Sequence, residues 1–191
     1  MAEIVLIRHG QTEWSANGRH TSYTDLDLTE TGIDQAKAVW ERLAGRTFAE
    51  VISSPRKRAL RTAELAGLTV TETTDDLAEW NYGEYEGVTT ADIRERRPGW
   101  SLWADGCPGG ESPEQVGARL DRVLARARDL LERGDVAMVA HGHCLRVCGA
   151  RWVGLPPKDG ALVKLDTATL SILSFEHRTS PVISRWNAPC G

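Results

Sequence analysis

Residues 4–10 read Ile-Val-Leu-Ile-Arg-His-Gly, and this stretch decides the fold that the sequence predicts. Its four aliphatic residues form a continuous run without alternation, which is typical of a strand buried on both faces of a parallel sheet. The run stops at Arg8-His9-Gly10. A buried strand is therefore expected to deliver a guanidinium and an imidazole to its carboxyl end.

The same pattern occurs again at residues 136–142, where the run Val-Ala-Met-Val-Ala ends in His141-Gly142. In open α/β sheets the functional crevice lies beyond the carboxyl ends of the strands, so both imidazoles should reach the same edge of the sheet. They meet if the two strands are neighbours. The glycine after each histidine lets a ligand approach the backbone closely, and the helix start after His141 offers free N–H groups to an anion. Phosphate is the anion that we expect there.

Strands and helices alternate along most of the remaining chain. Apolar residues at helical spacing, caps and glycine stops predict helices over residues 29–45, 54–66, 90–97, 112–134 and 142–154, with Ser54 as the N-cap of the second. Short apolar runs predict strands at 51–52, 162–165, 171–175 and 182–186, and residues 75–87 are expected to form an irregular surface segment. This alternation favours an α/β fold, a three-layer α/β/α sandwich with a mainly parallel central sheet.

Length and composition fit one globular domain spanning residues 1–191, with 41% hydrophobic and 26% charged residues. The net charge of −4 argues against nucleic acid or an anionic membrane as a partner, so an anion site has to be a local pocket. We expect a small phosphorylated metabolite as the partner. Nothing in the sequence indicates an oligomeric state.

The sequence favours a cytoplasmic location. The N-terminal apolar stretch is too short for a signal-peptide core, and no apolar run approaches the length of a membrane span. The four cysteines form no Cys-x-x-Cys pair, which predicts neither a disulfide framework nor a zinc knuckle. A reducing compartment is the simplest environment for such a chain.

Cations are placed where an anion should compensate them. Arg56, Lys57 and Arg58 stand in the first turn of a predicted helix, where the helix dipole favours carboxylates. Arg8, at the end of a buried strand, also needs an anionic partner to offset its desolvation. The pattern leaves Arg58 and Arg61 as alternative candidates for the pocket.

These groups suffice for phosphoryl transfer without a metal or another cofactor. The reaction depends mainly on positioning and charge neutralisation, which arginines and a neutral imidazole nucleophile provide. A leaving alkoxide still needs a proton. Glu79, Glu84 and Glu86, in the acidic segment at residues 75–87, are the candidate donors.

Other site chemistries fit the sequence less well. His143-Cys144 is similar to the start of a cysteine-phosphatase loop, but the closing arginine comes one residue late, at Arg151. A metal hydrolase could use His9, His141 and His143, yet neither helical histidine spacing nor an aspartate cluster accompanies them. A phospho-ligand binding module without turnover stays as the non-enzymatic alternative.

Further histidines and tryptophans are expected to have structural roles. His20 is predicted to lie at the surface or to support the fold, and His143 either lines the pocket or begins its helix. For Trp80, Trp100 and Trp103 we expect core packing rather than a substrate wall.

The chain resembles the histidine phosphatase superfamily, also called the phosphoglycerate mutase-like family, over nearly its whole length. Residues 8–14, Arg-His-Gly-Gln-Thr-Glu-Trp, look like the family signature, and residues 28–32, Leu-Thr-Glu-Thr-Gly, look like its next turn. The resemblance implies that His9 is the nucleophile. It also implies that Arg8, Arg58 and His141 hold the phosphate, which selects Arg58 over Arg61.

Residues 77–83, Leu-Ala-Glu-Trp-Asn-Tyr-Gly, resemble the segment that carries the family's proton donor, which selects Glu79. Mutases of the family usually have an Arg-His pair directly after that glutamate, whereas this chain has Trp80-Asn81. The resemblance therefore implies a phosphatase, similar to acid phosphatases and a sedoheptulose bisphosphatase, that acts on small phosphomonoesters, sugar phosphates among them. Cofactor-dependent mutase activity is the alternative.

Four further positions are expected to contact substrate: Ser15, Thr21, Ser22 and Gly142. Two of them depart from the family pattern. Ser15 stands where many members have asparagine, and Ser22 stands where glycine is common. The substrate side of the site is thus where this chain is expected to differ from its relatives.

Overall fold

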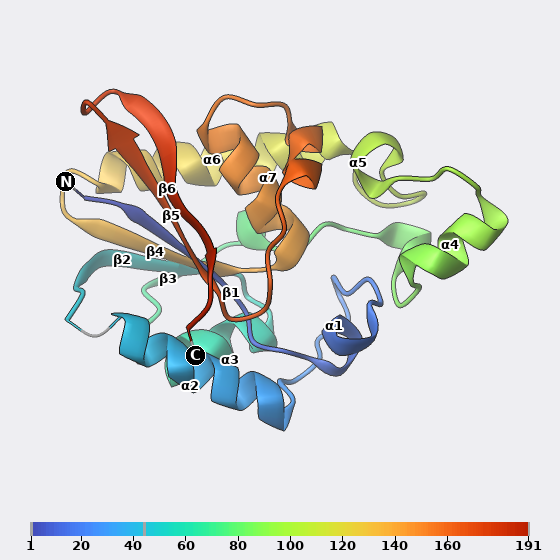
Figure 1. Cartoon of the computed structure of the whole chain (residues 1–191), viewed down its shortest axis with the longest axis horizontal. Helices are drawn as coiled ribbons and strands as arrows, with labels where there is room; N and C mark the ends of the chain where they lie inside the picture. The colour runs from blue at the N-terminus through green and yellow to red at the C-terminus, as the bar shows by residue number, and fades with distance from the viewer. Residues whose placement is uncertain (1, 44, 191) are drawn as a thin grey trace.

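The computed structural model describes residues 2–43 and 45–190, and its centre is a six-stranded sheet with helices on both faces (Figure 1). The strand order is β3-β2-β4-β1-β5-β6. The four strands β1, β2, β3 and β4 are parallel to one another, and β5 and β6 add an antiparallel edge. The predicted sandwich with a mainly parallel sheet is therefore confirmed. The strands are β1 (Ile4–Arg8), β2 (Phe48–Ser53), β3 (Glu72–Thr73), β4 (Asp135–Ala140), β5 (Leu170–Glu176) and β6 (Ser180–Ala188).

The two strands that end in His-Gly are neighbours. Their parallel register runs from Ile4 opposite Val136 to Arg8 opposite Ala140. The pairing continues one residue further, because the His9 N–H donates to the Ala140 carbonyl at 2.9 Å. Both histidines therefore leave the sheet at the same edge, as predicted.

Two helix layers cover the sheet, because side chains of β1 alternate between them. Val5 and Ile7 pack in the core beneath α2 and α3, whereas Ile4 and Leu6 pack in the core beneath α6 and α7. Figure 1 shows α1, α4 and α5 beyond the carboxyl end of β1, on the side of the histidines. The helices are α1 (Glu13–Asn17), α2 (Glu30–Leu43), α3 (Lys57–Leu65), α4 (Thr90–Arg96), α5 (Leu102–Asp105), α6 (Pro113–Leu130) and α7 (Gly142–Trp152).

The five predicted helices are present, and the first is confirmed as far as Leu43, since residue 44 lies outside the described residues. The cap of the second was predicted wrongly. α3 begins at Lys57 with Arg56 as its N-cap, and the Ser54 hydroxyl accepts a hydrogen bond from the His141 ring at 2.7 Å and a longer one from the Arg56 N–H at 3.4 Å. Two short helices, α1 and α5, were not predicted. In α1 the signal is a capping box between Thr12 and Ser15.

Two other segments differ from the expectation. Residues 162–165 form no strand: Leu162 is the last residue of a 3₁₀ helix (Pro157–Leu162), and the Leu165 carbonyl accepts a hydrogen bond from Arg8. Residues 75–87 are not a surface segment, because Leu77, Trp80 and Tyr82 are at most 2% exposed. Their aromatic residues belong to the core between the sheet and α6, which an aperiodic pattern does not reveal.

The loop after β1 packs against the first turn of α2 through two glycines. A Cβ atom on Gly10 would overlap with the Gly32 carbonyl, and one on Gly32 would overlap with the Gln11 carbonyl. Close packing is completed by the Thr29 N–H, which donates to the Gln11 carbonyl at 2.9 Å. The position of His9 thus depends on the absence of side chains at these two places.

We predict that Gly32→Ala destabilises the fold by about 2–3 kcal/mol, because the new methyl group meets rigid backbone. Gly99→Ala is the matched control, since Gly99 has a φ of +82° but a methyl group added there would have no neighbouring atom within 4 Å. It should cost only about 1 kcal/mol, from backbone strain. Urea unfolding measures both variants, and equal losses would show that the Gly32 contact is unimportant.

Candidate active site

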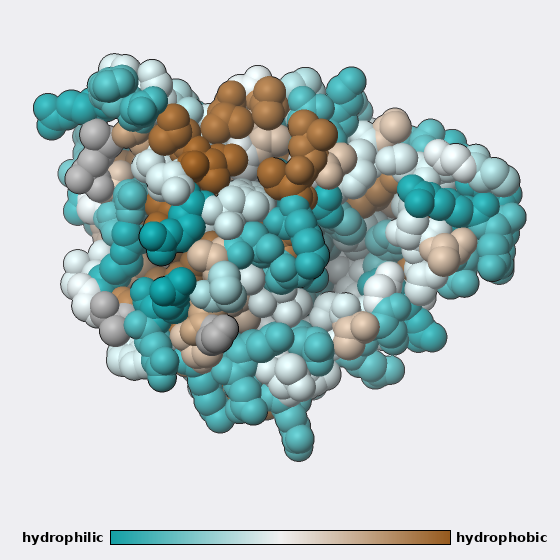
Figure 2. All heavy atoms as spheres, viewed as in Figure 1, coloured by the Kyte–Doolittle hydropathy of each residue, from teal (hydrophilic) through white to brown (hydrophobic). Residues whose placement is uncertain are grey.

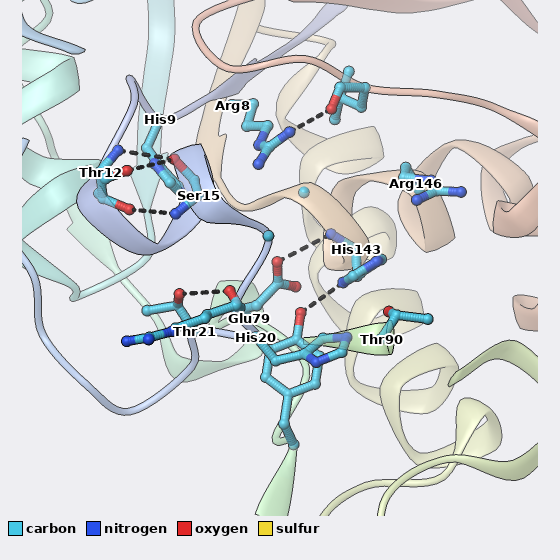
Figure 3. A pocket seen from close by; sticks show the side chains of 15 residues that line it. Arg8, His9, Thr12, Ser15, His20, Thr21, Glu79, Thr90, His143 and Arg146 are labelled. Carbon is cyan, nitrogen blue, oxygen red and sulfur yellow. Dashed lines mark hydrogen bonds between the residues drawn. The ribbon is translucent and has the colours of Figure 1, made fainter. Parts of the chain in front are cut away.

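A cavity of about 270 Å³ opens beyond the carboxyl ends of β1 and β4 (Figure 3). Side chains from the β1 end, α1, the loop after α1, the segment after β3 and the start of α7 line it. Six of the nine predicted site residues belong to this lining: Arg8, His9, Ser15, Thr21, Glu79 and Gly142. Arg58, His141 and Ser22 lie behind it.

His9 presents one free ring nitrogen. Its Nδ1 lies 2.7 Å from the Gly10 carbonyl, which can only accept, so Nδ1 carries the proton and Nε2 carries the lone pair. Among the described residues Nε2 has no hydrogen-bond partner, yet it is not sealed from solvent. Burial, followed by the charges of Arg58 and Arg8, holds the pKa of His9 well below its usual value. A neutral imidazole with an accessible lone pair results.

His141 lies beside His9, with 5.1 Å between the ring centroids. Its Nδ1 accepts a hydrogen bond from Nε of Arg58 at 3.1 Å, so its Nε2–H donates to the Ser54 hydroxyl at 2.7 Å. Burial and the Arg58 charge lower the pKa of His141, which therefore stays neutral. Both ring nitrogens have partners within the protein.

Arg58, and not Arg61, is the inward-facing cation of the α3 cluster. The Arg58 side chain is fully buried, whereas Arg61 is exposed and pairs with Glu64. The two terminal nitrogens of Arg58 donate to the carbonyl groups of the loop after α1, at Thr21, Ser22 and Thr24. Arg58 thus orients this loop and His141 while its charge acts on both imidazoles.

Arg8 lies against Gly142. A Cβ atom on Gly142 would come within 3.2 Å of the Arg8 Cζ, so this glycine makes room for the guanidinium. The expectation that glycines follow the histidines to admit a ligand is therefore replaced by closer packing inside the protein. One Arg8 nitrogen donates to the Leu165 carbonyl, and its buried Nε has no partner among the described residues. Such a buried, unpaired donor is rare in a protein interior.

The carboxylate of Glu79 occupies the N-terminus of α7. Its Oε1 accepts from the backbone N–H groups of Trp80 and Cys144 at 2.9 and 2.8 Å, and its Oε2 accepts from that of His143 at 3.0 Å (Figure 3). The helix start that was expected to bind a substrate anion therefore binds this side chain instead. Glu79 is fixed at the cavity wall by main-chain donors.

A buried ion pair holds the segment that carries Glu79. Arg119, on α6, forms a two-pronged ion pair with Glu111 at 2.8 and 3.0 Å. Its terminal nitrogens also donate to the carbonyl groups of Asp76, Ala78 and Glu79. Neither member of this pair was singled out from the sequence, because the contacts join residues far apart in the chain.

Ser22 does not line the cavity. Its hydroxyl donates to the Glu79 carbonyl at 3.2 Å, and its N–H donates to the Glu86 carboxylate at 2.8 Å. These bonds fix the loop after α1 against the segment that follows β3. Ser22 therefore supports neighbouring groups, and the expected direct contact with substrate is replaced by an indirect one.

The far wall of the cavity includes His143, which lines the pocket in the first turn of α7 and so fits both alternatives given for it. His20 is only 6% exposed and lines the cavity, which excludes the surface position among its two expected roles. Tyr82, His143 and Arg146 lie beside it. Arg146 stands three residues after His143 on α7, and this helical spacing was the available signal. Trp80 and Trp100 are buried in the core, as expected.

Two other kinds of feature, a metal site and a membrane span, are absent from the described part of the chain. Across residues 2–43 and 45–190, no three histidine, cysteine, aspartate or glutamate side chains are grouped as a metal site requires. None of the helices in this part is both long and apolar enough to pass through a bilayer.

The sheet order, the helix layers and the paired histidines define the phosphoglycerate mutase-like class of α/β folds. Residues 4–189 match the model of the histidine phosphatase superfamily (branch 1), so the chain belongs to this superfamily. A solved structure of an open reading frame product from Mycobacterium tuberculosis has a TM-score of 0.96 and 44% identity, covering 100% of this chain and 99% of the other.

Two curated relatives extend over most of the chain. An acid phosphatase of Mycobacterium tuberculosis is 48% identical over 181 residues, which are 91% of this chain and 87% of the relative. A sedoheptulose 1,7-bisphosphatase of Saccharomyces cerevisiae is 34% identical over 212 aligned positions, covering 94% of this chain and 77% of the relative. Both names describe phosphatases.

We predict that stability falls as the pH drops below about 6.5. Burial lowers the pKa of His9, His141 and His143 in the folded state, so the unfolded chain binds more protons in this window and is favoured. Each histidine contributes up to about 1.4 kcal/mol per pH unit. Urea unfolding between about pH 7.5 and 5.5 should show the decline, with a smaller slope in His143→Gln. A constant unfolding free energy over this range would contradict neutral burial.

Proposed function

We propose that this protein is a phosphoric monoester hydrolase that acts on small metabolites, sugar phosphates among them, through a phosphohistidine on His9. The accessible lone pair on Nε2 of a neutral His9 is the observation that carries the proposal. The names of the two phosphatase relatives support the reaction class. The guanidinium group of Arg8, which lines the same cavity, supports an anionic substrate.

The reaction has two steps. In the first, Nε2 of His9 attacks phosphorus, the bond from phosphorus to the ester oxygen breaks, and Glu79 in its protonated form gives its proton to the leaving oxygen and becomes a carboxylate. In the second, water attacks phosphorus, loses a proton to Glu79, and the phosphorus–nitrogen bond breaks. Glu79 and His9 return to their starting states. Oε2 of Glu79, which accepts one N–H bond while Oε1 accepts two, is the oxygen with room for the proton.

Two guanidinium groups supply the positive charge that phosphoryl transfer needs, so no step uses a metal. Arg8 lines the cavity and holds the transferred group directly. Arg58 acts together with His141 from behind His9, and burial together with the Arg58 charge lowers the pKa of the nucleophile. On binding of phosphate, His141 can exchange its bond with the Ser54 hydroxyl for one with a phosphate oxygen.

Hydrolysis is favoured over mutase activity by the residue that follows Glu79. Trp80 is fully buried, and its indole N–H donates to the Glu111 carbonyl at 2.9 Å. The position is thus part of the core and offers no cation to a second anionic group of a mutase substrate. Turnover is favoured over mere binding because nothing within the protein engages Nε2 of His9 among the described residues.

We further propose that the chain forms one histidine phosphatase domain over residues 1–191 and works in the cytoplasm. The match to the superfamily over residues 4–189 supports the single domain. The cytoplasmic location is supported by the four cysteines, which are free thiols.

Replacing His9 with glutamine should lower kcat by about 10³-fold or more, because no other side chain can form the covalent intermediate. Hydrolysis of an activated aryl phosphate measures this. Acid-labile phosphate bound to quenched protein should be found in the wild type and be absent in the variant. His177→Gln, which alters an exposed histidine in the turn between β5 and β6, is the control and should retain activity. Full activity in His9→Gln would exclude the mechanism.

Replacing Glu79 with glutamine should lower kcat for the hydrolysis of alkyl phosphates about 100-fold more than kcat for activated aryl phosphates, because only an alkoxide needs a proton to leave. The ratio of the two kcat values measures the effect and is independent of the fraction of folded protein. Glu84→Gln, at an exposed position of the same segment, should leave the ratio as it is. Equal losses for both substrates would assign the proton to another group.

A further inference from the structure

The imidazole of His143, on the far wall of the cavity, is held in one tautomer. The hydroxyl of Tyr82 lies 2.6 Å from Nδ1 of His143. Burial raises the pKa of Tyr82 well above its usual value, so the phenol keeps its proton, and Nδ1 of His143 is the one acceptor within its reach in the described part of the chain. Burial also keeps His143 neutral by lowering its pKa. The single ring proton of His143 therefore resides on Nε2, which is a hydrogen-bond donor.

The imidazole of His20 is held in the other tautomer, with its proton on Nδ1. Its Nδ1 lies 2.7 Å from the carbonyl of Val88, which can only accept, so the ring proton is on Nδ1. Burial lowers the pKa of His20, and the ring is neutral. Nε2 of His20 is consequently a hydrogen-bond acceptor.

Both Nε2 atoms are available to a ligand. The two rings line the cavity that His9 lines, with 6.1 Å between their centroids (Figure 3). Within the described part of the chain neither Nε2 has a hydrogen-bond partner, and neither is sealed from solvent. Aromatic neighbours hold the rings in place. The ring centroids of Tyr82 and His20 are 4.6 Å apart, and those of Trp103 and His143 are 5.3 Å apart.

We propose that His20 and His143 recognise a hydroxyl group on the leaving alcohol, and that the enzyme therefore prefers phosphate esters of polyhydroxylated alcohols. A hydroxyl accepts the hydrogen bond from Nε2–H of His143 and donates its own proton to Nε2 of His20. This inference rests on the proposed function, since the alcohol is the group that leaves when His9 is phosphorylated.

A carboxylate or an ammonium group satisfies only half of this pair. A carboxylate has no proton to give to the acceptor on His20, and an ammonium group has no lone pair for the donor on His143. A hydrocarbon chain would desolvate both nitrogens and pair neither, which a site built for a hydroxyl penalises strongly. Arg146, on the same wall, donates from Nε to the Gly160 carbonyl at 3.0 Å, and its charge adds to burial in lowering the pKa of His143.

The test compares glycerol 1-phosphate with n-propyl phosphate, which have the same carbon chain and differ only in hydroxyl groups. The wild type should prefer glycerol 1-phosphate by about tenfold in kcat/KM, as expected for a paired donor and acceptor. His143→Phe keeps a ring but removes the N–H group, and the ratio should fall to about one. His143→Gln restores a side-chain N–H group and should restore most of the preference.

Tyr82→Phe provides a second, independent variant, because it removes the group that fixes the proton on Nε2 of His143 without altering either histidine. The ratio should fall here as well. Since both substrates are measured on one enzyme preparation, partial loss of folded protein does not change the ratio. A variant that fails to fold is replaced by the other.

The outcomes separate this inference from the proposed function. If the wild type hydrolyses an activated aryl phosphate but shows no preference for glycerol 1-phosphate, only the hydroxyl recognition is wrong. The same conclusion follows if the preference persists in both His143→Phe and Tyr82→Phe. If the wild type hydrolyses no phosphate ester, there is no leaving alcohol to recognise, and both proposals fail.

Discussion

The parallel pairing of β1 with β4 is the constraint on which the candidate site depends. Its register brings Arg8 opposite Ala140, so His9 and His141 emerge side by side with ring centroids 5.1 Å apart. A slip of one residue would turn the inward side chains of β1 to the other face of the sheet. Both faces of β1 are buried under helices, so the hydrophobic cores determine the geometry of the imidazoles. On the face seen in Figure 2, polar side chains cover much of the outside of these layers.

Burial and charge then determine the chemical state of the site. Desolvation disfavours protonated imidazoles, and the nearby guanidinium groups of Arg58 and Arg8 disfavour them further. The cations are in turn held by carbonyl oxygens of the loops, and the carboxylate of Glu79 lies near them. A single buried arrangement thus gives the site a neutral nucleophile, two cations held in place and a carboxylate beside them.

Local patterns predicted the parts of this arrangement that depend on a few successive residues. The strand runs ending in His-Gly and the helix caps are of this kind, and the family resemblance selected Arg58 and Glu79. The sequence could not reveal contacts between distant segments. The roles of Ser54 beside His141 and of Gly142 beside Arg8 exist only once the chain has folded. The core position of residues 75–87 was missed because their burial follows no period.

Main-chain donors at the start of α7 hold Glu79, and this has an evolutionary consequence. Every amino acid except proline supplies a backbone N–H group, so the sites at 143 and 144 can mutate without releasing the carboxylate. The side chain at position 143 forms part of the far wall of the cavity. Descendants of such a gene can therefore acquire new substrate preferences by point mutation while inheriting the same proton-transfer apparatus.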